Sequence, residues 1–289
     1  MSARRDRGPL PGFGLAGGTT LLYLGVLVLL PLAALTLKAT ELSWSDFIRL
    51  VASDRALASY RLTFGAAAAA ALVNLVFGSI AAWVLERYRF PGRRLVDALI
   101  DLPFALPTAV AGIALAAAYA PNGWIGSRIE PLGLKVAYTP VGVGVALTFI
   151  GLPFVVRTLQ PVLRALEPAI EEAAASLGAT RAQTLRRIVL PEILPAAATG
   201  FVLALARGLG EYGSVIFIAG NLPLKSEITA LLIMVRLEEY DYAGATAIAS
   251  VFLLASFLLL LVLNRLAARR PPGTSSATGA GEGREGPAR

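Results

Sequence analysis

Long apolar runs alternate with short polar stretches along this chain, and the pattern predicts helices that span a membrane. A hydrocarbon layer of about 30 Å needs roughly 20 residues of helix. The segments that meet this length lie at about 18–37, 62–85, 102–120, 138–156, 193–215 and 242–264. The sequence therefore predicts an all-α polytopic membrane protein with about six transmembrane helices.

The composition agrees with a membrane protein and excludes several kinds of chemistry. Hydrophobic residues make up 56% of the 289 residues, and the mean hydropathy is +0.68. The chain contains no cysteine and no histidine, which excludes disulfides, thiolate chemistry, the usual zinc sites and histidine acid–base catalysis. The net charge is +7, but the sequence contains no basic helix with interleaved aromatic residues. We therefore do not expect nucleic-acid binding, and the absence of histidine and cysteine makes an integral membrane enzyme a weak alternative.

The first apolar segment has the features of an uncleaved membrane anchor. It follows Arg4, Arg5 and Arg7, but it is too long for the core of a signal peptide, and no A-x-A site follows it. We expect Pro31 to kink this helix. The mixed segment 39–61 is expected to form a short surface helix on the outside.

The distribution of positive charge predicts the orientation. With the N-terminus in the cytoplasm, the cytoplasmic ends and loops carry 17 of the 26 Lys and Arg residues, and the outside loops carry eight. Because cytoplasmic loops are enriched in positive charge, this orientation is favoured, with both termini in the cytoplasm. The Gly-, Ser- and Pro-rich tail 269–289 is expected to be disordered.

The stretch Glu167–Pro191 is a polar loop between apolar runs, and it reads as two short helices joined by a turn. Pro168 suits a first helical position, and Gly178 suits the left-handed residue that follows a helix end. Thr180 and Gln183 form a capping box for a second helix that reaches about Leu190. Pro191 is expected to break the chain there, before the next span.

The loop resembles the EAA loop of ABC importer permeases. Glu172-Ala173-Ala174, Gly178 and Ile188-x-Leu190-Pro191 stand at the defining spacing. The resemblance implies that this loop is the coupling helix, which seats in a groove of a cytoplasmic ATPase. The alternative is an ordinary amphipathic hairpin at the membrane surface. The residues expected to carry the coupling are Glu171, Glu172, Ala173, Ala174, Gly178, Ile188, Leu190 and Pro191.

The fifth apolar segment carries a stripe of small residues and two charges. Gly200, Ala204 and Gly208 recur every fourth residue, which allows close helix contact. Arg207 and Glu211 lie beside the stripe, four residues apart. Charges at this depth should face protein or water. Two interpretations remain open for Arg207: it lines an anion pathway, or it is structural, either as the ion-pair partner of Glu211 or with its head at the cytoplasmic interface.

Longer matches resemble one branch of the family, the T-type subunit of sulfate/thiosulfate importers. They include the segments 102–110, 152–161, 210–215 and 217–221. The resemblance implies a permease subunit of an ATP-driven importer for sulfate or thiosulfate in the bacterial plasma membrane. A molybdate or tungstate permease is the alternative within the class, and an ion-coupled carrier is the alternative outside it. The residues assigned to the substrate pathway are Arg207, Glu211, Tyr212, Gly213 and Ser214.

The chain has no G-x-x-x-x-G-K-[ST] motif, so the resemblance implies that ATP and Mg²⁺ are used by a separate ATPase and that this chain binds no cofactor. The implied partners are a second, W-type permease in a heterodimer, two ATPase subunits and an extracytoplasmic sulfate-binding protein. We expect an N-terminal region over residues 1–58, a permease core over 59–268 with the coupling loop 167–191, and a C-terminal tail over 269–289.

Overall fold

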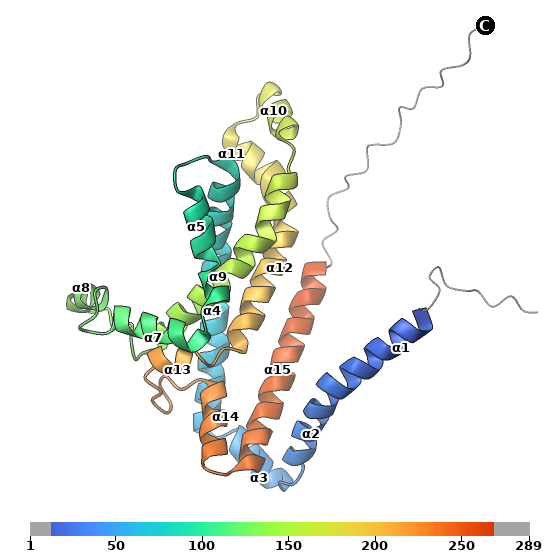
Figure 1. The fold of residues 1–289 in the computed structure, drawn as a ribbon, viewed down its shortest axis with the longest axis vertical. Coiled ribbons are helices and arrows are strands. Elements are labelled where there is room, and N and C mark those ends of the chain that lie inside the picture. Colours follow the sequence, from blue (N-terminus) through green and yellow to red (C-terminus); the bar gives the residue numbers. More distant parts are fainter. Residues whose placement is uncertain (1–12, 269–289) are drawn as a thin grey trace, which may run out of the picture. The chain divides into compact units, whose positions relative to one another are not determined.

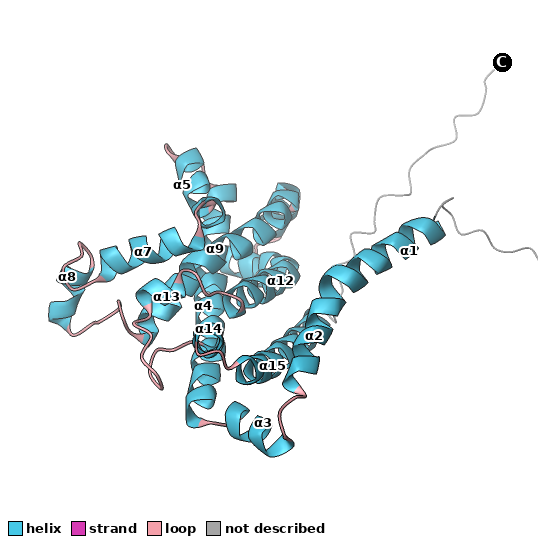
Figure 2. Ribbon diagram, turned by 60° about the horizontal axis from the view of Figure 1, so that its bottom comes forward, coloured by secondary structure: helices cyan, strands magenta, loops and turns pink. Residues whose placement is uncertain are grey.

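A computed structural model describes residues 13–268 of the chain. The predictions for Arg4, Arg5, Arg7 and the tail 269–289 lie outside the described residues. Throughout the described range the regular elements are helices joined by loops, as Figures 1 and 2 show. The all-α fold class is therefore confirmed.

The longest helices are α4 (Asp54–Arg87), α9 (Pro140–Ala165) and α15 (Tyr242–Ala268), together with the helical run that ends in α12 (Leu190–Leu209). Shorter helices fill the connections between them. The elements up to residue 132 are α1 (Phe13–Leu24), the π-helical turn η1 (Gly25–Leu29), α2 (Leu30–Ala39), α3 (Trp44–Val51), α4 (Asp54–Arg87), α5 (Arg93–Ile100), α6 (Leu102–Ala105), α7 (Thr108–Tyr119), α8 (Gly126–Ile129) and the 3₁₀ turn η2 (Glu130–Leu132). The later elements are α9 (Pro140–Ala165), α10 (Pro168–Ser176), α11 (Arg181–Thr184), the π-helical turn η3 (Leu185–Val189), α12 (Leu190–Leu209), α13 (Val215–Ile218), α14 (Thr229–Glu238) and α15 (Tyr242–Ala268).

Five helical runs among the described residues are long and apolar enough to cross a membrane. They correspond to the first, second, fourth, fifth and sixth predicted spans and are Gly14–Ala39, Asp54–Arg87, Pro140–Ala165, Arg181–Leu209 and Tyr242–Ala267. The third predicted span contains a shorter apolar helix, α7, so the prediction of about six apolar membrane helices holds.

The third span, predicted as one helix over 102–120, is divided in two. Helix α6 ends at Ala105, and Leu106 has extended backbone angles of φ −86° and ψ 135° before Pro107. A proline disfavours the helical region for the residue in front of it because its ring clashes with that residue's backbone. Pro107 therefore separates α6 from α7.

Two prolines follow π-helical turns instead of ending their helices. The turn η1 precedes Pro31, and the turn η3 precedes Pro191. Proline cannot donate to the carbonyl four residues earlier, and a π-helical turn is one way in which a helix absorbs that loss. The predicted break at Pro191 is wrong, because the helical run continues from Arg181 to Leu209.

The fifth span ends earlier than predicted, and the segment after it is more structured. Helix α12 stops at Leu209 rather than near residue 215, just before Gly210. The short helix α13 and the ten-residue helix α14 then follow before α15. Neither α13 nor α14 was expected, because the polar residues of this stretch obscured its helical pattern.

The chain divides into two compact units, and α4, α9 and α15 contribute residues to both. Unit 1 comprises Met1–Ala66, Gly112–Val143 and Gly210–Phe257; unit 2 comprises Ala67–Ala111, Gly144–Leu209 and Leu258–Arg289. In unit 1, Ala56, Leu232 and Ile248 form a buried apolar cluster. A second cluster joins α2, α3 and α15 through Ala39, Val51 and Ala247.

Unit 2 is held together by close approach of helix backbones. A Cβ at Gly200 would lie 3.0 Å from the Cα of Val155 in α9. A Cβ at Gly208 would lie 3.4 Å from the Cβ of Ala67 in α4. The predicted small-residue stripe on α12 therefore does allow close contact with two neighbouring helices.

Candidate functional site: a helical docking loop

Helix α10 begins and ends where its sequence predicts. Pro168 occupies the first turn after the extended residue Glu167. At the other end, Gly178 has φ +83°. The Gly178 N–H donates to the Ala175 carbonyl at 3.0 Å, and the Ala179 N–H donates to the Ala174 carbonyl at 3.0 Å. These two bonds form a Schellman motif, which needs a left-handed residue at the glycine position.

The predicted capping box is present at the start of α11. The Thr180 hydroxyl accepts from the Gln183 backbone N–H at 3.3 Å, and the Gln183 side-chain oxygen accepts from the Thr180 N–H at 2.8 Å. The turn between α10 and α11 is thus determined at both ends by local hydrogen bonds. In Figure 1, α10 and α11 lie together at the end of α12.

The two neighbouring glutamates of α10 have different surroundings. Glu171 is half-buried, and its Oε1 accepts from Arg87 Nη2 at 2.6 Å. Arg87 ends α4 and also lies over the Trp83 ring, 5.2 Å from the ring centroid. Glu172 is exposed. Glu171 therefore ties α10 to α4, whereas Glu172 faces outward.

The rest of α10 presents small and apolar side chains outward. Ala173 is exposed and Ala174 is partly exposed. Leu177 is 89% exposed and Ile170, seven residues earlier, is 47% exposed. Leu177 directly follows the last residue of α10, and exposed apolar side chains that lie together on one surface are typical of contact sites for other proteins. Sequence reasoning missed both residues, although their seven-residue spacing on a predicted helix was available as a signal.

The remaining residues of the EAA pattern lie on the continuous helix after α11. Ile188 is partly buried, and Leu190 and Pro191 are exposed. Val189 between them is buried, with 1% of its surface accessible. The pattern residues therefore belong to two surfaces: the tip around α10, and the base, where the loop joins the span.

A set of ion pairs supports the base of the loop. Arg164, near the end of α9, makes a bidentate pair with Glu86 of α4 at 2.8 and 2.9 Å. Arg157, two turns earlier, binds Asp101 through two nitrogens and Asp97 through a third bond at 2.7 Å. These pairs join α5, α9 and α4, so they fix the helices that carry α10.

The Asp97 carboxyl shows how strongly this network acts. Burial opposes ionisation of Asp97 and is the largest single effect on it. Hydrogen bonds from Arg157 and Gln160 and the charges of Arg157 and Arg164 together outweigh burial, so the pKa of Asp97 is lowered. The ionised form is therefore the one the fold stabilises.

The predicted pathway residues lie around the end of α12 rather than within one continuous helix. Arg207 lies in the last turn of α12, and Glu211 lies two residues beyond the end of that helix. Neither side chain is without a partner. Glu211 Oε1 accepts from the Ser214 N–H at 2.8 Å and from its hydroxyl at 2.9 Å. Tyr212 and Gly213 form the partly buried turn between them.

These features define a class: a helical polytopic membrane protein with an exposed, capped helix, α10, between two of its spans. A sequence profile of one family, the binding-protein-dependent transport system inner membrane components, matches residues 74–272. The chain belongs to this family and is a transport component of the membrane.

The curated relatives are similar over nearly the whole chain. The sulfate transport system permease protein CysT of Salmonella typhimurium is 52% identical over 269 residues, 93% of this chain and 97% of the relative. The protein of the same name from Escherichia coli is 51% identical over 269 residues, with the same coverage. That from Synechocystis sp. is 49% identical over 247 residues, 86% of each chain.

Solved structures share the fold at low sequence identity. A chain of a bacterial ABC transporter involved in the import of the acidic polysaccharide alginate has a TM-score of 0.73 and 18% identity, covering 89% of this chain and 96% of that one. A chain of the MetNI methionine ABC transporter has a TM-score of 0.53 and 17% identity, covering 79% of this chain and 97% of that one. The fold is that of ABC importer permeases.

Proposed function

We propose that this chain is the permease subunit of an ATP-driven importer that carries sulfate or thiosulfate across the bacterial plasma membrane. The observation that carries the proposal is the docking loop, whose EAA residues form a capped helix with Glu172 and Leu177 turned outward. The anion is suggested by relatives about 50% identical that are named sulfate transport system permeases.

The mechanism follows from the docking loop. Two copies of an ATPase bind ATP and Mg²⁺, and their closure moves α10. The ion pairs of Arg87, Arg157 and Arg164 transmit that movement to α4, α5 and α9. An extracytoplasmic sulfate-binding protein delivers the anion, and a second, W-type permease completes the pathway. Both termini and the docking loop lie in the cytoplasm, and residues 59–268 form the permease core.

The test of coupling compares two glycines with the same backbone conformation. Gly178 and Gly133 have φ +83° and +82°, and a Cβ at either would meet no atom within 4 Å. Aspartate at either position costs about 1–2 kcal/mol of backbone strain. We expect Gly178→Asp to abolish sulfate uptake and ATPase binding in reconstituted vesicles, while Gly133→Asp retains both. Equal uptake by the two variants contradicts the docking assignment.

The same vesicles test the substrate. Labelled sulfate should enter with ATP, and unlabelled thiosulfate should compete, whereas molybdate should not. Competition by molybdate alone contradicts the sulfate assignment without affecting the docking assignment. Uptake that needs an ion gradient rather than the ATPase contradicts both.

The orientation can be tested separately because the chain has no native cysteine. A cysteine in place of Ser176, in α10, should resist a membrane-impermeant thiol reagent in intact cells. A cysteine in place of Ser53, between α3 and α4, should react. The reverse pattern contradicts cytoplasmic termini.

Arg207 is proposed to supply positive potential to the anion pathway, to which we also assign Glu211, Tyr212, Gly213 and Ser214. Arg207→Gln should reduce sulfate uptake while ATPase binding persists. A structural role predicts that Arg207→Gln with Glu211→Gln recovers uptake. An inactive, well-expressed double variant supports the pathway role, and recovered uptake refutes it.

A further inference from the structure

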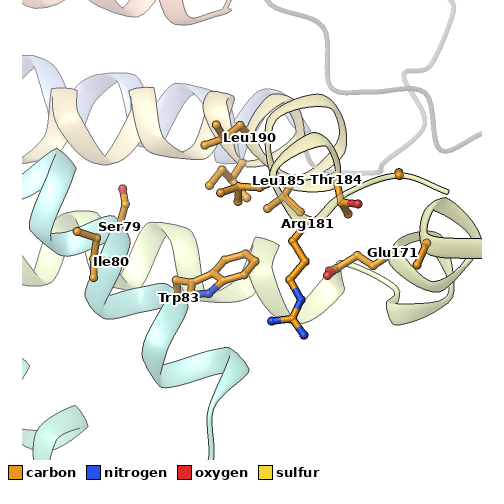
Figure 3. A pocket seen from close by; sticks show the side chains of 12 residues that line it. Ser79, Ile80, Trp83, Glu171, Arg181, Thr184, Leu185 and Leu190 are labelled. Carbon is orange, nitrogen blue, oxygen red and sulfur yellow. The ribbon is translucent and has the colours of Figure 1, made fainter.

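A groove of about 550 Å³ opens in unit 2, beside the docking loop. One wall is α4, from Ser79 to Trp83, and the other is the helical run from Arg181 to Ile193. Glu171 and Ala175 of α10 also line the groove, and Figure 3 shows Glu171 at one end of it. The volume is within the range of about 300–1,000 Å³ that is usual for ligand sites.

The walls of the groove are apolar although they are exposed. Ile80 is 55% exposed, Leu185 is 43% exposed and Leu190 is 46% exposed. Trp83 forms a section of the same surface, as Figure 3 shows. Contact between such side chains and water is unfavourable, so a hydrocarbon occupant is favoured.

The groove lies where two apolar spans end. The span of α4 finishes at Arg87, and the next span of unit 2 that lines the groove starts at Arg181. Arginine and tryptophan at helix ends are typical of the level of lipid headgroups. The groove therefore runs from headgroup level into the hydrocarbon layer.

The mouth of the groove carries one positive charge without a compensating partner among the described residues. The carboxylate of Glu171 is neutralised by Arg87 at 2.6 Å. The Arg181 side chain makes no hydrogen bond or ion pair with any described residue, and it lies between Trp83 and Glu171 (Figure 3). An anion beside Arg181 would meet this charge.

We propose that the groove binds an anionic phospholipid, with an acyl chain against Ile80, Leu185 and Leu190 and the phosphate at Arg181. The apolar walls match the acyl chain of a lipid, and the cation at the mouth matches its phosphate. A helix from another protein would not necessarily place an anion beside Arg181. Basic pockets between membrane helices bind anionic headgroups in this way.

A lipid in this groove would also affect ATPase binding, and this consequence rests on the proposed function. Because Glu171 and Ala175 line the groove, the lipid contacts the docking helix from behind. Occupancy should therefore steady α10, and loss of the lipid should weaken ATPase binding without removing any residue of the outward face.

The test measures lipid retention, which is independent of transport. The full chain, extracted with its partners, is washed in detergent and its phosphatidylglycerol and phosphatidylcholine are counted by mass spectrometry after re-addition of equal amounts. Arg181→Gln should retain about fivefold less phosphatidylglycerol, the factor expected for one cation at a membrane surface. Arg186→Gln is the matched control, since Arg186 is exposed on the next turn but does not line the groove.

Two further variants keep the test decisive. Arg181→Lys keeps the charge and should retain the lipid, which separates loss of charge from misfolding. Ser79→Trp fills the apolar half and should reduce retention, whereas Phe77→Trp, on the exposed side of α4, should not.

Three outcomes would overturn the proposal. One is equal retention by Arg181→Gln and Arg186→Gln, and another is equal retention of both lipids by the unaltered chain. The third is efficient cross-linking of a cysteine at position 80 to the second permease, which would show a protein occupant. Failure of sulfate uptake with lipid retention intact would count against the proposed function alone.

Discussion

The two units bury polar side chains in different ways. In unit 1, Arg55 makes a bidentate pair with Glu227 at 2.7 Å, and the Glu227 side chain is only 2% exposed. Nearby, the Thr63 hydroxyl accepts from the Thr229 N–H at 2.9 Å and lies 3.1 Å from the Thr229 hydroxyl. These contacts tie the start of α4 to the start of α14.

Unit 2 also pairs a buried carboxylate, Glu86, with an arginine, Arg164, but that arginine is itself 61% exposed, and the unit leaves one buried amide unsatisfied. Asn74, in the middle of α4, is 1% exposed, and neither its Nδ2 nor its Oδ1 has a hydrogen-bond partner among the described residues. The ion pair of Arg87 with Glu171 is 20% and 29% exposed. Unit 1 therefore satisfies the polar groups of its core by contacts between α4 and α14, whereas unit 2 has partly exposed ion pairs beside α10 and one unsatisfied buried amide.

The largest effect on stability should come from breaking the ion pair between Arg55 and Glu227 in unit 1. Arg55→Gln leaves the buried Glu227 carboxylate without its cation, and loss of one partner of a buried pair typically costs about 3–5 kcal/mol. Thermal unfolding of the purified chain should show a large fall in Tm. Arg49→Gln is the control, because Arg49 pairs with Asp46 at the surface and should cost at most about 1 kcal/mol. Similar losses for both variants would refute the difference.

Replacement of Asn74 should raise the stability of the chain rather than lower it. Asn74→Leu removes two unsatisfied polar atoms and keeps the number and branching of the side-chain heavy atoms, so unfolding should require about 1–3 kcal/mol more free energy. Thr63→Val, which removes a satisfied hydroxyl in unit 1, should instead lower stability. Loss of stability in both variants would mean that the Asn74 amide is hydrogen-bonded in the protein.

The pair between Arg87 and Glu171 should contribute little to stability and more to coupling. Glu171→Gln should change the free energy of unfolding by less than about 1 kcal/mol, because the pair is partly solvated. ATP hydrolysis per sulfate imported should rise, since α10 loses its tie to α4. Reversal of both charges, Arg87→Glu with Glu171→Arg, should restore the ratio. A ratio unchanged by Glu171→Gln would show that the tie is not used in transport.

The smallest effect is the pH dependence of Asp97. Its pKa is lower in the folded state than in the unfolded chain, so its contribution to stability is present above about pH 3.9, the usual value for aspartate. The contribution is lost as pH falls through the lowered value. The difference in Tm between the unaltered chain and Asp97→Asn should therefore be constant near neutrality and shrink in acid. A difference that grows in acid would contradict this sign.

The docking loop was predictable because its determinants are local. Pro168, Gly178 and the Thr180–Gln183 box act over three or four residues, so each appears in the sequence as a short pattern. The difference between Glu171 and Glu172 was not predictable in the same way. It depends on Arg87, which is 84 residues away in the chain.

The prolines also show that one residue type can have different effects which the sequence alone does not predict. Pro107 divides its predicted span, whereas Pro191 follows a π-helical turn and leaves its span continuous. The missing N–H is identical in both cases. What differs is the backbone of the residue in front: Leu106 is extended before Pro107, whereas Leu190 before Pro191 is helical, with φ −59° and ψ −44°.

The sequence by itself determined the helical class, the position of most spans and the form of the docking loop, because hydrophobic length and capping are properties of neighbouring residues. Tertiary structure alone decided which charges pair, where the fifth span ends, and that a groove opens between α4 and the run from Arg181 to Ile193. These features join residues far apart in the chain, and their energies depend on burial and distance, which only the packed helices define.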